Sequence, residues 1–345
     1  MGQFLSCIFR RTPPPLPPLL QLPAEILLLI ASRLSSSPES LIALSLTCKT
    51  LFSFFDRDAL KLCDQSRKDL LLLLEKDLGD RFFYCPTCRN LHRFPKPWHL
   101  ADLFQYSHCS SCKRYHYCNI FTPNDASSYK LIYIHARLVM NRHFYGSPKG
   151  LPLESIAFPA IARNEPDEPF WQETPSARII GDELFLCITH SLAGRGTTLR
   201  DIIDRGWSGI CNHLAGDRFR SMPELLEPGE YESNELLLFE DCHNGPGSCN
   251  VCLTDYITTV ERAEVHERIQ DRLGQERPLV DGWSITITAY HQVGQCRDPE
   301  DWKWARFIEY PPYRFLLQGP FKERDMALHP PGAIRERWET GGLSV

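Results

Sequence analysis

The sequence predicts an α+β protein with a helical N-terminal region and a mixed, largely antiparallel C-terminal region. Three observations predict this fold class. Apolar residues recur at helical spacing between residues 22 and 78, and paired cysteines mark the segment that follows. Further on, apolar and polar residues alternate at 179–188 and 283–289, as in half-buried strands. The chain has 345 residues, 43% of them hydrophobic, which is enough for a small helical module and one or two globular parts.

Residues 22–55 are expected to form three short helices. Pro23 suits a first helical turn, because its missing N–H would have no partner there. Ser37 can cap a second helix, and Thr47 can cap a third. The apolar residues of this segment include Ile26, Ile30, Leu34, Leu41, Leu44 and Leu51. So short a segment cannot bury such a face alone, so it either binds a partner or is the first part of a larger core.

The order of residues in this segment resembles an F-box. Leu22-Pro23-x-Glu25-Ile26 is followed by an apolar helix, a Ser/Pro break, a Leu-x-x-Leu pair and Cys48-Lys49. The resemblance implies an F-box at residues 21–58 that binds a Skp-type adaptor and, through it, a cullin. The protein would then be a non-catalytic substrate receptor of an SCF ubiquitin ligase. The residues that would bind the adaptor or hold the F-box fold are Leu22, Pro23, Ile26, Ile30, Leu34, Leu41, Leu44, Cys48 and Leu51.

Residues 1–20 are expected to be a disordered tail that carries an acylation signal. Gly2 fits the N-myristoylation pattern with Ser6, and Cys7 can take a palmitoyl chain. Prolines at 13–18 indicate a stiff, extended spacer. The pattern predicts a cytoplasmic protein with peripheral membrane attachment. The alternative is a chance Met-Gly start on an unmodified tail, and a nuclear location remains open.

The cysteines predict a zinc site after a linking helix at 59–80. There are fourteen in the chain and no readable signal peptide, which favours reduced thiols over disulfides. Two Cys-x2-Cys pairs in the cysteine-rich segment, residues 81–150, have the spacing of a structural zinc site. The predicted ligands are Cys85, Cys88, Cys109 and Cys112, with His92, His116 and Cys118 as substitutes. The alternative is four ordinary cysteines, and a RING is disfavoured because a second, interleaved quartet is missing.

A second zinc site is not expected. Cys249 and Cys252 form a good pair, but their nearest partners, Cys242 and His243, are adjacent in sequence and poorly spaced.

Basic residues concentrate at 85–150, with nine Lys/Arg against two Asp/Glu, whereas 151–345 carries nineteen against thirty-two. No recognition helix or RNA-binding motif accompanies the basic segment, so nucleic acid is disfavoured as a partner. The alternative function is a zinc-stabilised protein- or nucleic-acid-binding module without a ligase role.

Residues 151–345 are expected to form an α+β region that binds a protein substrate, and one short helix is expected at 199–203. No common catalytic motif is present, and His190-Ser191 and His291 are interpreted as buried, hydrogen-bonded residues. No run of apolar residues is long enough to predict a transmembrane helix.

The resemblance to a filamentous-fungal family of F-box proteins extends to four downstream blocks: YCPTCRNLHRF, LIYIHARLVMNRHFYGSPKGL, CNVCLTDY and ITAYHQVGQCRDPEDWKW.

Overall fold

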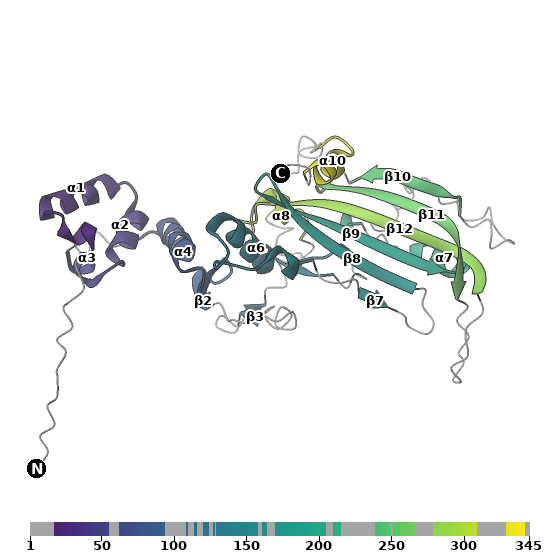
Figure 1. Cartoon of the computed structure of the whole chain (residues 1–345), viewed down its shortest axis with the longest axis horizontal. Coiled ribbons are helices and arrows are strands. Elements are labelled where there is room, and N and C mark those ends of the chain that lie inside the picture. The colour runs from purple at the N-terminus through teal and green to yellow at the C-terminus, as the bar shows by residue number, and fades with distance from the viewer. Residues whose placement is uncertain are drawn as a thin grey trace, which may run out of the picture. The chain divides into compact units, whose positions relative to one another are not determined.

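In the computed structural model (Figure 1) the chain divides into two units, Met1–Leu74 and Glu75–Val345. Each unit has its own apolar core. The N-terminal helices and the antiparallel sheet that follows confirm the predicted α+β class. The structure describes residues 17–54, 62–93, 108–109, 114–115, 120–123, 127, 129–157, 161–163, 170–204, 210–214, 239–249, 251–266, 279–308 and 329–341. Among the described helices, none has both the length and the apolar character needed to cross a membrane.

The first unit contains the three helices expected between residues 22 and 55. They are α1 (Ala24–Leu34), α2 (Pro38–Ser45) and α3 (Lys49–Phe54), preceded by the 3-10 turn η1 (Pro18–Gln21). Each α-helix contributes one buried leucine, and Leu27, Leu41 and Leu51 pack together. A longer helix, α4 (Asp64–Leu78), continues into the second unit and corresponds to the expected linking helix, of which residues 59–61 lie outside the described ranges.

The helix starts differ from the expected capping. Ser37 precedes α2, but its hydroxyl bonds to the side chains of Glu39 and Ser40 and caps no backbone N–H. Thr47 does not cap α3, because its hydroxyl donates to the carbonyl of Leu44 at 2.7 Å. The residue directly before α3 takes that place, since Cys48 Sγ accepts from the N–H of Leu51 at 3.4 Å. The predicted helices are therefore present, but two of the predicted caps are wrong.

The second unit is built on one six-stranded antiparallel sheet with the strand order β10-β11-β12-β9-β8-β7. Figure 1 shows its long strands running side by side. The strands are β7 (Ile161–Arg163), β8 (Phe170–Ile180), β9 (Glu183–Gly194), β10 (Cys242–Ser248), β11 (Thr254–His266) and β12 (Leu279–Gly294). The strand expected at 283–289 is the middle of β12.

The strand expected at 179–188 is in fact a tight hairpin. β8 ends at Ile180 and β9 begins at Glu183, with only Gly181 and Asp182 between them. Both turn residues have positive φ, 55° and 62°, which is the backbone of a type I′ turn. Five consecutive residues, 184–188, are buried on both faces of the sheet, so β9 is not half-buried as alternation suggested. The Gly-Asp pair was the sequence signal for this turn.

Helices pack against this sheet and complete the second core. They are α6 (Tyr133–Tyr145), α7 (Gly196–Asp204), α8 (Trp302–Ala305) and α10 (Ala333–Thr340), with 3-10 turns η4 (Leu153–Ser155) and η5 (Asn212–Leu214). The helix α7 confirms the one expected at 199–203. α6 is buried on all sides over residues 133–141, and its core partners include Leu184, Phe185 and Trp304.

Three two-stranded sheets accompany the large one: β1 (Phe82–Cys85) with β2 (Asn90–Arg93), β3 (His108–Cys109) with β4 (Arg114–Tyr115), and β5 (Ile120–Phe121) with β6 (Leu131–Ile132). The first is a hairpin in which Cys85 lies opposite Asn90. The described part of the cysteine-rich segment thus contains three short two-stranded sheets and the helix α6.

A buried ion pair joins the start of the second unit to its core. Arg137 Nη2 lies 2.5 Å from Glu75 Oε2, and both side chains are almost fully buried. The carboxylate also accepts from Asn141 Nδ2 and from the N–H of Tyr84, both at 2.9 Å. Burial disfavours the Arg137 cation, but Glu75 more than offsets this and raises the arginine pKa. A buried charge with this many partners holds its neighbours in one arrangement.

Candidate functional site

The first unit leaves an unusual number of large apolar side chains exposed. Across the whole described chain, nine large hydrophobic residues are exposed, and seven of them lie within residues 22–54. They are Leu22, Ile26, Leu28, Leu29, Leu46, Phe52 and Phe54. Soluble proteins rarely leave such a concentration of apolar side chains on so short a segment unless it binds a partner.

Helix α1 explains how one short segment can both fold and remain apolar outside. Its sequence, AEILLLIASRL, places apolar residues on nearly every face. Leu27, Ala31 and Leu34 pack inward at helical spacing, whereas Ile26 and Leu29 are 41% and 56% exposed. The inward stripe therefore contains Leu27 and Ala31 in place of Ile26 and Ile30, and Leu34 belongs to both stripes.

The structure separates the predicted adaptor-binding residues into two groups. Leu41 and Leu51 are buried in the helical core, and Leu34, Leu44 and Cys48 pack against it. The exposed group is Leu22, Pro23 and Ile26, and Ile30 is half-buried. The first group holds the three helices together, and the second is available to a partner. Leu29, which the sequence analysis did not single out, is more exposed than Ile26 and lies on the same side of α1.

Comparison with known proteins assigns this segment. Residues 19–61 match the family model described as F-box-like. The chain carries an F-box-like domain. Such a domain implies binding to a Skp-type adaptor, and F-box proteins are generally non-catalytic components of SCF complexes. No curated protein and no solved structure matches the chain. The exposed side chains described above thus belong to the F-box-like domain.

The first cysteine pair of the cysteine-rich segment comes together with a histidine. Cys85 and Cys88 lie at the β1–β2 turn and His92 lies on β2, with their ligand atoms all within 4.8 Å of one another. Cys88 Sγ is 2.7 Å from His92 Nε2, and burial lowers the pKa of His92. A neutral imidazole beside two thiols is a donor set that suits zinc.

The other predicted ligands of that site are placed less fully. Cys109 belongs to the short strand β3, where only the backbone is described, and Cys112 lies outside the described residues together with His116 and Cys118. The set Cys85, Cys88, Cys109 and Cys112 therefore stays a prediction. The acylation candidates Gly2 and Cys7 also lie outside the described ranges.

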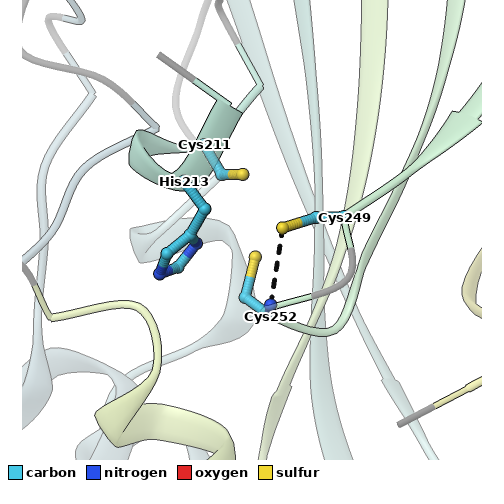
Figure 2. Close-up of side chains that lie close together, drawn as sticks. All are labelled: Cys211, His213, Cys249 and Cys252. Carbon is cyan, nitrogen blue, oxygen red and sulfur yellow. Dashed lines mark hydrogen bonds between the residues drawn. The ribbon is translucent and has the colours of Figure 1, made fainter. Parts of the chain in front are cut away.

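A second cluster, which the sequence analysis did not expect, lies beside the large sheet. It consists of Cys211, His213, Cys249 and Cys252, whose ligand atoms are all within 4.8 Å of one another. Figure 2 shows the three sulfur atoms turned toward one another, with the imidazole of His213 beside them. The ligands come from two places far apart in sequence: Cys211 directly precedes η5 and His213 lies within it, and the other two lie between β10 and β11.

The expected partners of Cys249 and Cys252 were wrong. Cys242 and His243 begin β10, whereas Cys249 directly follows its last residue, so the length of the strand separates the two pairs. Cys242 is buried opposite Val260, and His243 is exposed. The signal that was missed is the Cys-x-His spacing at 211–213, which can place a thiol and an imidazole on one metal ion.

Ionisation within the second cluster is uneven. Burial raises the pKa of Cys211 and of Cys252. Hydrogen bonds from these two neighbours lower the pKa of Cys249, despite its burial. Backbone N–H groups of Val251 and Cys252 point at the same sulfur, at 3.3 and 3.5 Å. Cys249 is therefore the thiol of the cluster best prepared to exist as a thiolate.

The buried histidines of the sheet do not form a nucleophilic site. His190 Nδ1 lies 3.3 Å from Glu173 Oε1 in the interior. Ser191 follows His190 on β9, so its side chain projects from the opposite face of the sheet. His291 Nδ1 lies 2.9 Å from Thr254 Oγ1. His291 is thus a buried, hydrogen-bonded histidine as expected, whereas His190 is buried beside the Glu173 carboxylate.

Proposed function

We propose that the protein is a substrate receptor of an SCF-type cullin-RING ubiquitin ligase. In this proposal the F-box-like domain binds a Skp-type adaptor, the adaptor connects it to a cullin, and residues 81–345 bind a protein substrate. The observation that carries the proposal is the exposed apolar side of a segment that matches the F-box-like model. The ubiquitin would be transferred by other subunits, and this chain would select the substrate.

The energetics of the exposed side chains support a stable adaptor complex. Full burial of one leucine, isoleucine or phenylalanine contributes about 1.5–3 kcal/mol. Ile26 and Leu29, one turn apart on α1, are both exposed, and Leu22 precedes the helix on the same chain segment. Burying three such side chains offsets a large part of the cost of association, which makes them the expected centre of the interface.

The second unit supports a receptor role because it has a separate, well-filled core. Its core residues come from the six-stranded sheet and from helices that cover it, and the described part of the F-box-like domain contributes none of them. It can therefore present a surface to a substrate while the F-box-like domain is occupied.

We further propose that Cys85, Cys88 and His92 hold a structural zinc ion in the cysteine-rich segment, with Cys109 or Cys112 as the fourth ligand.

The proposed location is the cytoplasm, with peripheral membrane attachment through acylation of Gly2 and Cys7. A Gly2→Ala variant removes the myristoylation site and leaves the F-box-like domain untouched. If the proposal holds, the wild-type chain is found in the membrane fraction and the variant in the supernatant. Equal distribution of the two chains would contradict it.

The adaptor interaction is tested with the full-length protein and a purified Skp-type adaptor. We compare wild type with Ile26→Asp/Leu29→Asp, which places two charges on the exposed side of α1 and leaves the packed residues Leu34, Leu44 and Leu51 in place. The matched control is Phe170→Asp, the same kind of change at an exposed apolar residue of the second unit. We expect the double variant to lose adaptor affinity by at least about 100-fold, or about 3 kcal/mol, while the control binds as wild type.

Circular dichroism of the same samples shows whether the double variant keeps its helices. A wild-type chain that does not bind the adaptor would overturn the proposal and leave the zinc-stabilised binding module as the alternative. A folded double variant that still binds would show that α1 is not the interface.

Receptor function is tested separately from adaptor binding. The Ile26→Asp/Leu29→Asp chain keeps residues 81–345 intact, so it should still bind substrates but no longer connect them to the cullin. Proteins that associate with both chains, and that are ubiquitinated only with wild type, are the expected substrates. The absence of any protein with this behaviour would contradict the receptor role.

A further inference from the structure

The cluster of Cys211, His213, Cys249 and Cys252 has the composition of a complete metal site. Three thiols and one imidazole form one of the standard donor sets for structural zinc. With Zn–S distances of about 2.3 Å, a tetrahedral site requires its ligand atoms to lie about 3.8 Å apart. All four ligand atoms here fall within 4.8 Å of one another, so only small side-chain movements separate the cluster from that geometry.

The turn between β10 and β11 is built to hold a thiolate. Val251 and Cys252 donate their backbone N–H groups to Cys249 Sγ at 3.3 and 3.5 Å, and Figure 2 shows the second of these bonds. Such bonds favour the charged sulfur that a metal requires. The turn is itself fixed, because the Cys249 N–H donates to the carbonyl of Thr254 at 2.9 Å and Arg306 Nη1 donates to the carbonyl of Val251 at 2.7 Å.

A second layer of side chains supports the other thiol of this turn. Cys252 Sγ lies 3.1 Å from Thr254 Oγ1, which in turn lies 2.9 Å from His291 Nδ1. Cys252, Thr254 and His291 have no measurable exposure. Zinc ligands are typically held by such neighbouring hydrogen bonds, which fix the direction of the ligand atom.

Two features of the cluster are left unexplained by packing alone. Its three cysteines are thiols at most 3% exposed, none of them in a disulfide, and an odd number of thiols cannot be satisfied by one disulfide. Also, His213 Nδ1 is buried and has no hydrogen-bond partner among the described residues. A buried imidazole nitrogen without a partner is costly, and a bound metal ion would satisfy it.

We propose that Cys211, His213, Cys249 and Cys252 bind one structural zinc ion. Four protein ligands complete a tetrahedral coordination shell, so the ion has no open position for catalysis. Its role is to fasten the segment around η5 to the turn between β10 and β11, two regions that the chain brings together from either side of residues 215–238. This site does not depend on the adaptor-binding proposal.

The first test measures zinc in the purified full-length protein by elemental mass spectrometry. Cys249→Ser/Cys252→Ser should lose one equivalent of zinc per chain relative to wild type. The matched control is Cys242→Ser, which changes a buried cysteine on the adjoining strand outside the cluster and should retain the full content. A Cys85→Ser/Cys88→Ser variant measures any zinc at the β1–β2 hairpin, so that the two sites are counted separately.

A second pair of variants tests the histidine. His213→Cys keeps four ligands and should retain the ion, whereas His213→Ala should bind it more weakly and release it to a competing chelator sooner. Equal retention by both variants would overturn the assignment of His213 as a ligand. Unchanged zinc content in Cys249→Ser/Cys252→Ser would overturn the site as a whole.

The wild-type protein provides a test that does not depend on whether a variant folds. We label thiols with an alkylating reagent before and after treatment with a zinc chelator and locate the label by peptide mass spectrometry. Cys211, Cys249 and Cys252 should be labelled faster after chelation, because the ion no longer fastens the segment around η5 to the β10–β11 turn, whereas the rate for Cys242 on β10 should not change. Cobalt substitution should give the absorption of a tetrahedral thiolate site. Absence of this absorption, together with labelling that is the same with and without chelator, would exclude the metal.

Discussion

The two units of the chain distribute their apolar and polar side chains in opposite ways. The F-box-like domain buries only a small cluster around Leu27, Leu41 and Leu51, and it leaves most of the exposed large hydrophobic residues of the described chain on its surface. The second unit buries a continuous core from sheet and helices, and it also encloses polar groups such as Glu75 and Arg137. The first unit leaves an apolar surface available to a partner, whereas the second unit buries its apolar side chains through its own contacts.

This difference determines how each unit should respond to change. Where apolar side chains face solvent, substitution alters binding more than folding. Where a charge is buried with fixed partners, removal of one partner leaves the other without compensation. All seven tryptophans lie beyond residue 74, so tryptophan fluorescence reports the second unit alone, while far-ultraviolet circular dichroism reports both. The two signals allow the comparison to be tested in the intact chain.

The largest effect is expected from Arg137→Met. The substitution leaves Glu75 buried without its cation, which should lower the free energy of unfolding of the second unit by about 3–5 kcal/mol. Denaturant titration followed by tryptophan fluorescence measures it. The control Arg81→Met removes an exposed arginine of the second unit and should change stability by less than about 0.5 kcal/mol.

A paired change tests whether the lost compensation is the cause. Glu75→Gln removes the charge but keeps an oxygen that can accept from the Tyr84 N–H. The double variant Glu75→Gln/Arg137→Met should therefore be more stable than Arg137→Met alone. If the two are equally unstable, the loss comes from packing of the arginine side chain and the electrostatic account is wrong.

A core leucine of the F-box-like domain should give the next largest effect. Leu51→Ala removes a buried side chain from the small helical cluster and should cost about 3 kcal/mol. The helical signal should be lost at lower denaturant concentration, while the fluorescence transition stays in place. Leu29→Ala is the contrasting variant, because its exposed side chain should affect stability little and adaptor affinity strongly. A shift in the fluorescence transition with Leu51→Ala would show that the units do not unfold separately.

Acid should affect the two units differently. Burial lowers the pKa of His135 to about 4, below its ordinary value of 6.5. As the pH falls through 6.5, the unfolded chain takes up a proton that the folded chain excludes, so stability is lost progressively between pH 6.5 and 4. The loss is at most about 3 kcal/mol from this residue. Residues 17–54 contain no histidine, so the F-box-like domain should change little over this window.

The variant His135→Leu removes the titrating group and serves as the control. Its fluorescence-detected stability should depend less on pH between 6.5 and 4 than that of wild type. Parallel pH dependence of the two proteins would assign the acid sensitivity to other residues. His291, whose pKa burial lowers to about 3, is the next candidate.

Features set by neighbouring residues could be predicted from the sequence, whereas features set by distant contacts could not. The helices at 24–34, 38–45 and 49–54 were expected from the spacing of apolar residues and from proline and serine at helix starts. These signals depend only on residues within one or two helical turns. Which face of α1 packs inward was not predictable, because Leu27, Leu28 and Leu29 are consecutive and fit more than one stripe. Only contacts with α2 and α3 select Leu27.

The cysteines give the same result at the candidate metal sites. Cys249 and Cys252 were identified as a pair because two intervening residues fix their separation. Their partners, Cys211 and His213, lie on a different element, and only the fold brings them together. The adjacent Cys242 and His243 were closer in sequence, but the strand β10 holds them away. The hairpin turn at Gly181-Asp182 was readable locally, but residues 179–188 were interpreted as one alternating strand that runs through it.

The smallest effects are expected at the helix starts. There, one side chain at a helix start in each unit allows the two units to be compared directly. Burial alone would raise the pKa of Asp255, but hydrogen bonds from His329, Ser248 and the Arg335 backbone lower it to about 2. Its carboxylate accepts from the N–H groups of Ile334 and Arg335 at 2.7 and 3.1 Å and so caps α10. Asp255→Ala should cost about 1–2 kcal/mol at pH 7, and this contribution should vanish in wild type as the pH falls from 3.8 toward 2.

Ser37→Ala provides the matched change in the F-box-like domain. Ser37 occupies the N-cap position of α2 but makes no side-chain bond to the helix backbone. The variant should therefore change stability by less than about 0.5 kcal/mol, well below the usual loss at a working cap. Circular dichroism measures this change and fluorescence measures that of Asp255→Ala. If Ser37→Ala cost as much as Asp255→Ala, polar contacts would support the first unit as strongly as the second, and the contrast between the units would rest on their apolar side chains alone.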